Sequence, residues 1–398
     1  MKKILLAYSG GLDTSYCLKK LVKKYDVYTI TIDTGGFLES EKQKIKKQSI
    51  SMGAKKHILI NSKEKYYNRI IKYLIYGNVL KNNTYPLSVS AERIIHALEI
   101  LKYAEKKDIK LIAHGCTGAG NDQVRFDSIF ESLAPNIKII APIRDNNISR
   151  KDATKYLKQK GINIQRDISR YSINKGLWGT TIGGGETLTS NKPLPDKAFL
   201  NISLEEGSKK IIIGFKEGEL FKLNGKKMDP IEIIEKVSFL SQNYGIGRGI
   251  HVGDTILGTK GRIGFEAGGP IIILKAHHLL EKHTLTKWQQ FQKEQISNFY
   301  GMLIHEGQFL DPVIKDIEAF LKSSQSNVSG SIEITLYNKR FELNGIKSKN
   351  DLMSNSFGNY GESCGEWESS DVKGFVKIIS NQNKIYHNVI SKNKLKIK

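Results

Sequence analysis

Cysteine is scarce in this sequence, long apolar runs are absent, and each of these absences excludes a class of protein. The three cysteines, Cys17, Cys116 and Cys364, are too few, too scattered and odd in number for a disulfide framework. No apolar run approaches the length that crosses a bilayer. The run at residues 4–8 is too short for a secretory signal. We therefore expect a cytoplasmic protein with no membrane partner.

Arginine is also scarce, although the chain is strongly basic. The 62 Lys and Arg residues exceed the 40 Asp and Glu residues and give a formal charge of +22, but only 10 of the 62 are Arg. Nucleic-acid binders usually cluster their cations and use Arg for bidentate contacts, whereas Lys is spread along this whole chain. Nucleic acid is therefore not the expected partner. The 398 residues, 39% of them hydrophobic, suffice for two or three folded domains and exclude general disorder.

The first 160 residues alternate apolar, strand-like runs with amphipathic helical stretches. One helical stripe is Thr14, Cys17, Leu18 and Leu21, at positions i, i+3, i+4 and i+7. This alternation predicts an α/β domain with a parallel sheet covered by helices on both faces, and ligands bind at the carboxyl ends of such strands. The predicted strands are residues 4–9, 27–33, 57–60, 110–114 and 138–141, and a capping box predicts a helix over about 149–160.

The pattern of strand-like and helical stretches changes after about residue 165. Glycine-rich turns separate strand-like runs at 209–215, within 245–269 and at 271–275, and a long helical stretch lies near 285–303. We expect a nucleotide-binding domain at 1–165, an α+β domain at 166–370 and a basic tail at 371–398. Composition leaves open whether this tail is disordered or is an arm that contacts a neighbouring subunit.

Two glycine-rich loops carry the residues expected to do chemistry. The first, residues 9–15 (SGGLDTS), lies between a strand and a helix, so its glycines, hydroxyls and helix N-terminus can cradle phosphate. It is neither a Walker A loop nor a GxGxxG loop. The second, residues 114–125 (HGCTGAGNDQVR), can grip a zwitterion, with Asp122 for an ammonium, Thr117 and Asn121 for a carboxylate, and Arg125 for a second anion. The plainer alternative for both loops is a turn that caps a helix.

The first loop resembles the SGGxDS pyrophosphate loop of ATP pyrophosphatases, and the two loops together resemble those of the argininosuccinate synthase family. The likeness continues at residues 85–90, 171–172, 177–179, 245–248 and 357–358. The resemblance implies an adenine nucleotide α-hydrolase-like domain followed by a synthetase domain. It also implies a ligase that adenylates citrulline with Mg²⁺ and ATP, joins it to aspartate in arginine biosynthesis, and assembles as a homotetramer through a C-terminal arm.

The resemblance also assigns residues to the three substrates. Those expected at ATP are Ala7, Tyr8, Ser9, Gly10, Gly11, Leu12, Asp13, Thr14, Ser15, Ile32 and Gly115. Those expected at citrulline are Tyr85, Ser90, Asn121, Arg125, Ser172 and Thr181. Those expected at aspartate are Thr117, Asn121 and Asp122.

The chain departs from the family at the amino-acid end of citrulline. Gly253 stands where the family usually has a citrulline-binding Glu, and Phe265 stands where it has Tyr; at Thr181 the family usually has Ser. We expect Asp254 to bind the citrulline ammonium, with Gly253 letting the backbone turn it inward. The alternative is that Asp254 caps a surface turn.

Other features are not expected to carry chemistry. The spacing of His277, His278 and His283 matches no zinc signature, so no metal site of the protein's own is predicted. Nothing activates Cys116, and Trp178, Trp288 and Trp367 are expected in the core or in an interface.

Three other functions are alternatives to the one that the resemblance implies. The main alternative is another pyrophosphate-loop ATPase, one that adenylates a tRNA base, although no CxxC pair for sulfur transfer is present. A glutamine-hydrolysing asparagine synthetase would need a nucleophilic Cys where Lys2 stands. A non-enzymatic RNA-binding protein would have no need of two intact loops.

Overall fold

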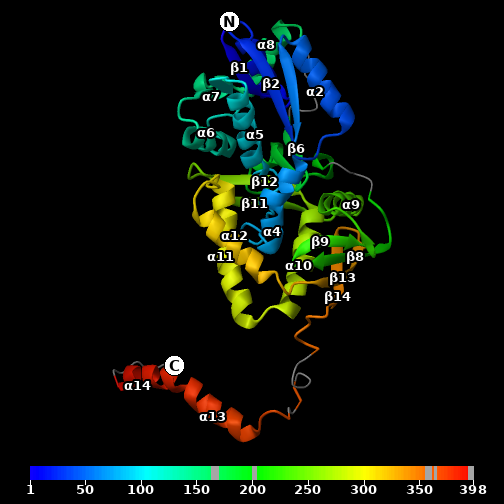
Figure 1. Cartoon of the computed structure of the whole chain (residues 1–398), viewed down its shortest axis with the longest axis vertical. Coiled ribbons are helices and arrows are strands. Elements are labelled where there is room, and N and C mark those ends of the chain that lie inside the picture. The colour runs from blue at the N-terminus through cyan, green and yellow to red at the C-terminus, as the bar shows by residue number, and fades with distance from the viewer. Residues whose placement is uncertain (163–169, 200–203, 355–360, 363–364, 393–398) are drawn as a thin grey trace. The chain divides into compact units, whose positions relative to one another are not determined.

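The computed structural model describes residues 1–162, 170–199, 204–354, 361–362 and 365–392 (Figure 1). The chain divides into two compact units, Met1–Asn350 and Asp351–Lys398. The predicted boundary at residues 165–166 lies outside the described residues, as do Cys364 and the family-like residues 357–358. No helix in the described part of the chain is long and apolar enough to cross a membrane.

The N-terminal part of the first unit contains a five-stranded sheet in the order β3-β2-β1-β4-β5, and all of its strand pairs are parallel. The prediction of a parallel α/β sheet is confirmed. Its strands are β1 (Lys3–Ala7), β2 (Asp26–Asp33), β3 (Lys56–Asn61), β4 (Leu111–Ala113) and β5 (Lys138–Ile140).

Helices cover both faces of this sheet because the alternation of side chains along a strand makes two apolar faces. On β1, Ile4 and Leu6 pack into one cluster, whereas Leu5 packs into the other. The helices are α1 (Leu12–Leu21), α2 (Glu39–Ser51), α5 (Glu92–Lys106), α6 (Asn121–Leu133), α7 (Pro142–Asp145) and α8 (Arg150–Gln159). The predicted cap of α8 is confirmed, since the Asp152 N–H donates to Ser149 Oγ at 3.1 Å.

A helical segment lies between β3 and β4 in the chain. A four-stranded antiparallel sheet has the strand order β11-β12-β7-β6. The helical segment is made of α3 (Lys63–Tyr66), η1 (Tyr67–Ile71) and α4 (Lys72–Tyr76). The strands are β6 (Tyr171–Gly176), β7 (Gly179–Gly184), β11 (Arg248–Asp254) and β12 (Lys260–Glu266), and β7 leads into η3 (Gly185–Leu188) and η4 (Asp196–Ala198). The turn after β2 abuts β6 closely: a Cβ on Gly36 would lie 2.7 Å from the Lys175 carbonyl carbon, so only glycine fits there.

A second five-stranded sheet, in the order β10-β9-β8-β13-β14, is antiparallel. Its strands are β8 (Ser208–Lys216), β9 (Glu219–Leu223), β10 (Lys226–Lys227), β13 (Gly330–Tyr337) and β14 (Arg340–Lys347). The helices that accompany it are α9 (Pro230–Asn243), α10 (Gly268–Thr284), α11 (Lys287–Glu306) and α12 (Val313–Ser324). The strand at 209–215, the long helix near 285–303 and the α+β character are therefore confirmed.

The strand predicted at 271–275 is wrong, because these residues lie in α10. The helix is buried on more than one side, against α9, β13 and β14, so it carries an apolar run instead of a single stripe. Periodicity does not separate a short apolar run of this kind from a buried strand.

The second unit contains two helices, α13 (Ser369–Ile379) and α14 (Asn381–Lys392). Its apolar side chains, among them Phe375, Ile378 and Tyr386, are exposed. The described residues of the predicted tail, 371–392, are thus helical apart from Ser380.

Candidate active site

The first glycine loop leaves β1 and enters α1 at Gly11, which has no side chain to cap the helix. Gly10 has φ +76°, and a Cβ there would lie 3.1 Å from Ile45 Cγ1 and 3.2 Å from Gln48 Oε1. Ser9 Oγ lies 3.2 Å from Thr14 Oγ1, and Thr14 Oγ1 donates to the Gly11 carbonyl at 3.3 Å. The hydroxyls of Ser9 and Thr14 therefore fix the conformation of the loop. The N–H groups of the first helical turn can donate to an anion.

Not all residues predicted at ATP face outward from this loop. Tyr8 and Ser15 are buried, with Tyr8 Oη 3.4 Å from Ser15 Oγ, and Gln48 Nε2 donates to the same Ser15 oxygen at 3.2 Å. Ile32 is buried near the end of β2. Burial raises the pKa of Asp13, and Arg150 opposes that rise.

The second glycine loop leaves β4, the strand next to β1, so the two loops meet at the same edge of the sheet. A Cβ on Gly115 would lie 3.1 Å from the Thr14 backbone nitrogen. His114 fixes the loop: its Nδ1 accepts from the Cys116 N–H at 3.2 Å, so its Nε2 donates to Asp127 Oδ1 at 2.8 Å. Burial raises the pKa of the Cys116 thiol, which therefore stays protonated at neutral pH.

Asp122, predicted to bind an ammonium, accepts from two arginines in this structure. Arg93 Nε donates to its Oδ2 at 2.9 Å, and Arg125 Nη1 donates to its Oδ1 at 2.8 Å. Burial favours the neutral acid, but the two guanidinium groups hold the pKa of Asp122 below its usual range. The lowered pKa keeps the Asp122 carboxylate ionised at neutral pH. Its side chain is 38% exposed, so a further cation can reach it.

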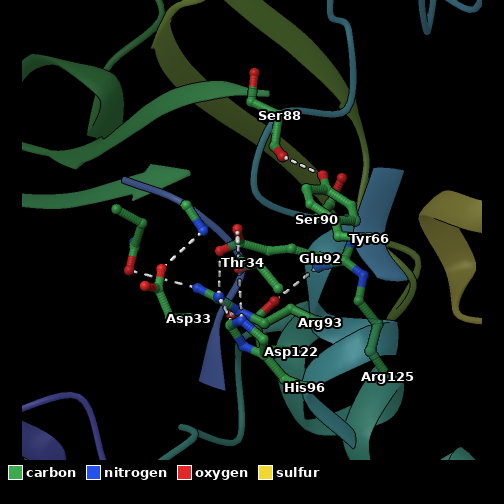
Figure 2. A network of polar contacts seen from close by, with 12 residues as sticks. Asp33, Thr34, Tyr66, Ser88, Ser90, Glu92, Arg93, His96, Asp122 and Arg125 are labelled. Atoms are coloured by element: carbon green, nitrogen blue, oxygen red, sulfur yellow. Dashed lines mark hydrogen bonds and ion pairs between the residues drawn. The ribbon is translucent and has the colours of Figure 1, made fainter. Parts of the chain in front are cut away.

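Arg93 in turn belongs to a closed ring of hydrogen bonds with Glu92, His96 and Thr34 (Figure 2). Arg93 Nη1 donates to Glu92 Oε1 at 2.7 Å and to His96 Nδ1 at 3.4 Å. His96 Nε2 lies 3.0 Å from Thr34 Oγ1, which donates to Glu92 Oε2 at 2.9 Å. Burial lowers the pKa of His96 to about 3, so the ring nitrogen that faces Arg93 is an acceptor.

This ring was not predicted from the sequence. The available signal was the i, i+4 spacing of Glu92 and His96, two polar residues on a helix whose buried side chains are apolar apart from Glu92 and Glu99. Burial raises the pKa of Glu92 to about 7, and Arg93 limits that rise. The ring fixes the guanidinium that holds Asp122.

The residues predicted at citrulline come from four parts of the chain, namely the segment at 85–90, α6, β6 and β7. Tyr85 is buried and stacks on His251, with ring centroids 5.3 Å apart, and burial raises its pKa to about 12. Ser90 Oγ donates to the Leu87 carbonyl at 3.2 Å. Thr181 is buried on β7 opposite Phe265 of β12.

Three more predicted residues, two of them expected at citrulline and one at aspartate, join neighbouring segments or lie at the surface. Ser172 is exposed on β6. Asn121 Oδ1 accepts from the Ile256 N–H at 3.0 Å and so ties α6 to the turn after β11. Thr117 lies in the second loop, where its Oγ1 would be 3.3 Å from a Cβ on Gly120.

Asp254 is not turned inward, and this part of the prediction is wrong. The hairpin register pairs Asp254 with Lys260, the two side chains form an ion pair, and the Asp254 side chain is 68% exposed. The space beside Gly253 is already filled, because a Cβ there would lie 2.7 Å from His251 Nε2.

The remaining features are placed as follows. His277 is buried, with Nδ1 2.6 Å from Asn78 Oδ1 and Nε2 2.9 Å from Gln325 Oε1. No group of three His, Cys, Asp or Glu in the described residues could hold a metal ion. Trp178 is fully buried, as predicted, whereas Trp288 and Trp367 are exposed.

The parallel sheet and the two loops at its carboxyl edge define an α/β nucleotide-binding domain of the HUP type, joined to an α+β domain. A family model described as "Arginosuccinate synthase N-terminal HUP domain" matches residues 3–163, and one described as "Arginosuccinate synthase C-terminal domain" matches residues 171–386. The chain belongs to the argininosuccinate synthase family.

Relatives of full length carry the same name. The chain is 35% identical over 387 residues to an argininosuccinate synthase of Methanocaldococcus jannaschii, covering 96% of this chain and 97% of the relative. It is 36% identical over 401 residues to that of Xanthomonas campestris, covering 98% and 99%. It is 33% identical over 394 residues to that of Pyrococcus furiosus, covering 98% and 95%.

Proposed function

We propose that this protein is an ATP-dependent ligase of arginine biosynthesis. It joins citrulline to aspartate through a citrullyl-AMP intermediate and releases AMP and pyrophosphate. The observation that carries the proposal is the meeting of the two glycine loops at the ends of β1 and β4, with Gly115 packed against Thr14. A phosphate cradle and an amino-acid loop in contact are what an adenylating ligase needs.

ATP binds along the first loop in this proposal. The N–H groups at the start of α1 face the phosphates and stabilise the departing pyrophosphate. The residues assigned to ATP are Ala7 to Ser15, Ile32 and Gly115. Because Tyr8 and Ser15 are buried, their part is to support the loop through Gln48 instead of contacting phosphate.

The ureido carbon of citrulline is a poor electrophile, so its oxygen must first become a leaving group. Attack of that oxygen on the α-phosphate achieves this, and the aspartate amine then displaces AMP. Citrulline is assigned to Tyr85, Ser90, Asn121, Arg125, Ser172 and Thr181. Aspartate is assigned to Thr117, Asn121 and Asp122, where the ionised Asp122 meets its ammonium.

Mg²⁺ enters the proposal as the ion carried by the ATP phosphates. Asp13 is the carboxylate of the phosphate loop, and Mg²⁺ prefers phosphate, water and one or two carboxylates as ligands. The ion would neutralise phosphate charge. A cytoplasmic location is part of the proposal, since the reaction draws on ATP and free amino acids.

A homotetramer is also part of the proposal, with the C-terminal helices as arms. The exposed apolar side chains of α13 and α14 support an arm that is covered by a neighbouring subunit. Removing residues 372–398 should shift the mass in solution toward smaller species. Unchanged assembly by light scattering would contradict the arm.

A requirement assay tests the function. AMP and pyrophosphate release should need citrulline, aspartate and ATP together. If AMP and pyrophosphate release does not depend on either amino acid but increases with tRNA, the result would favour the ATPase that adenylates a tRNA base. Membership in the argininosuccinate synthase family speaks against that alternative.

A further inference from the structure

Four basic side chains gather beside Tyr85, in what we call the basic cluster: Lys81, Arg125, His251 and His305. Lys81 and Tyr85 exchange backbone hydrogen bonds, and His251 stacks on the Tyr85 ring. Lys81 Nζ donates to His305 Nδ1 at 2.8 Å, and Arg125 Nε donates to the His305 carbonyl at 2.9 Å. The cluster therefore includes one residue assigned to citrulline, Arg125, and its members Lys81 and His251 contact a second, Tyr85.

The basic cluster has more donors than acceptors. No carboxylate of a described residue lies within 4.0 Å of Lys81 Nζ; Glu306 and Asp254 attract it only from farther away. His251 is 6% exposed, and neither of its imidazole nitrogens hydrogen-bonds to a described residue. Arg125 donates from Nε to the His305 carbonyl and from Nη1 to Asp122. Its Nη2 has no hydrogen-bond partner among the described residues.

Protonation accounts for which nitrogens are donors. Because His305 Nδ1 accepts from Lys81, the proton of its neutral imidazole is on Nε2. Burial lowers the pKa of His305 to about 3, and it also lowers the pKa of Lys81. A half-buried ammonium with no carboxylate partner is costly, and an incoming anion would offset that cost.

We propose that the basic cluster binds the carboxylate at the amino-acid end of the ureido substrate, and that the site makes no use of a free α-ammonium there. The proposal rests on the proposed function, because Tyr85 and Arg125 place that end of the substrate. The substrate class it defines is a ureido carboxylic acid whose α-amine is free, acylated or absent.

In the described part of the chain, Asp254 and Asp122 already have cationic partners, and no carboxylate oxygen of Glu306 lies within 4.0 Å of Lys81 Nζ. Asp254 points to solvent and pairs with Lys260, and His251 fills the space beside Gly253. Phe265 packs on Tyr85, with ring centroids 5.6 Å apart, and has no hydroxyl. The Asp122 side chain is 38% exposed, and Arg93 and Arg125 already donate to both of its oxygens.

The test is a binding series on the full-length protein with a nonhydrolysable ATP analogue, measured by calorimetry. The probes are citrulline, N-acetylcitrulline, which blocks the ammonium, and citrullinamide, which removes the carboxylate. N-acetylcitrulline should bind within about threefold of citrulline or more tightly, and citrullinamide at least about tenfold more weakly. Any other order of affinities, or no binding of any probe, overturns the proposal.

Variants of Lys81 sharpen the test. Lys81→Met should weaken the binding of citrulline and N-acetylcitrulline at least about tenfold, because these two probes carry the carboxylate. The affinity for citrullinamide, which lacks it, should not change. Lys81→Arg should retain binding. The matched control is Lys260→Met, since Lys260 is an exposed lysine paired with Asp254, and it should change nothing. Equal weakening of all three probes by Lys81→Met would mean a structural role and would contradict the proposal.

Binding and turnover separate this inference from the proposed function. If the affinities follow the predicted order but no probe supports aspartate-dependent pyrophosphate release, the proposed function fails and the basic cluster stands. If citrulline is turned over but citrullinamide binds equally well, the function stands and the assignment of the basic cluster is wrong.

Discussion

The loop region and the basic cluster use polar side chains in opposite ways. In the second loop and the adjoining ring, side-chain donors and acceptors match: His114 is held between Cys116 and Asp127, and Arg93 is held by Glu92 and His96. In the basic cluster, donors remain without acceptors among the described residues. Matched networks hold a geometry before the ligand arrives, whereas unmatched charge awaits a ligand of opposite sign. Whether a buried polar group has its hydrogen-bond partners therefore indicates whether it holds the structure in place or awaits a ligand.

The largest effect is expected at Asp122, where the matched network is proposed to meet aspartate. Asp122→Ala should slow the second half-reaction by about thirtyfold or more, because a charged, partly buried contact is lost. Single-turnover formation of citrullyl-AMP should survive. Equal loss of both half-reactions would show that Asp122 shapes the loop instead of holding aspartate.

A smaller effect is expected at Gly10. Gly10→Ala places a side chain at φ +76° and a Cβ 3.1 Å from Ile45, so we expect the KM for ATP to rise about tenfold, a cost of about 1–2 kcal/mol. Gly258→Ala is the matched control, because Gly258 has φ +80° but open space around it. If both variants raise the KM for ATP equally, the contact at Gly10 plays no part.

Glu92 tests whether the matched ring is sensitive to pH. The groups that face it are Arg93 on its own helix, Thr34, which donates to it, and Asp122 on α6. Its pKa of about 7 lies above the usual 4.5, so the folded protein binds the proton more tightly than the unfolded chain. Stability from this group is complete below pH 4.5 and is lost as the pH rises through 7.

Glu92→Gln should remove that dependence. The free energy of unfolding of the variant, relative to the unmodified protein, should increase between pH 5 and pH 8 by at most about 3 kcal/mol. Urea denaturation at the two pH values measures it. A constant difference would mean that Glu92 ionises alike in both states.

The smallest effect is expected at Asp254. Asp254→Ala should change the KM for citrulline less than about twofold, because its exposed carboxylate pairs with Lys260 and salt and water screen it. Initial-rate kinetics measures this. A tenfold rise would restore Asp254 to the citrulline site and weaken the contrast between the two regions.

The sequence was informative where the chain is locally regular. The strands of the parallel sheet and both loops were predicted, because each apolar run has the length of a strand and a glycine-rich loop follows β1 and β4. Residues 271–275 were not, since a helix buried on several sides has no single stripe. The direction of Asp254 depends on the hairpin register with Lys260, which local sequence does not reveal.

The basic cluster and the ring could not be predicted for a different reason. Lys81 and His305 are 224 positions apart, and Thr34 and His96 are 62 apart. Only the completed fold brings such residues together, and no local pattern signals which distant partner a lysine will meet.

Isotope transfer tests the central claim most directly. Citrulline that carries heavy oxygen in its ureido group is incubated with the protein, ATP and aspartate, and the AMP and pyrophosphate are analysed by mass spectrometry. If the ureido oxygen attacks the α-phosphate, one heavy oxygen appears in each AMP and none in pyrophosphate. Label in pyrophosphate, or unlabelled AMP with the label retained in the amino-acid product, would contradict the account.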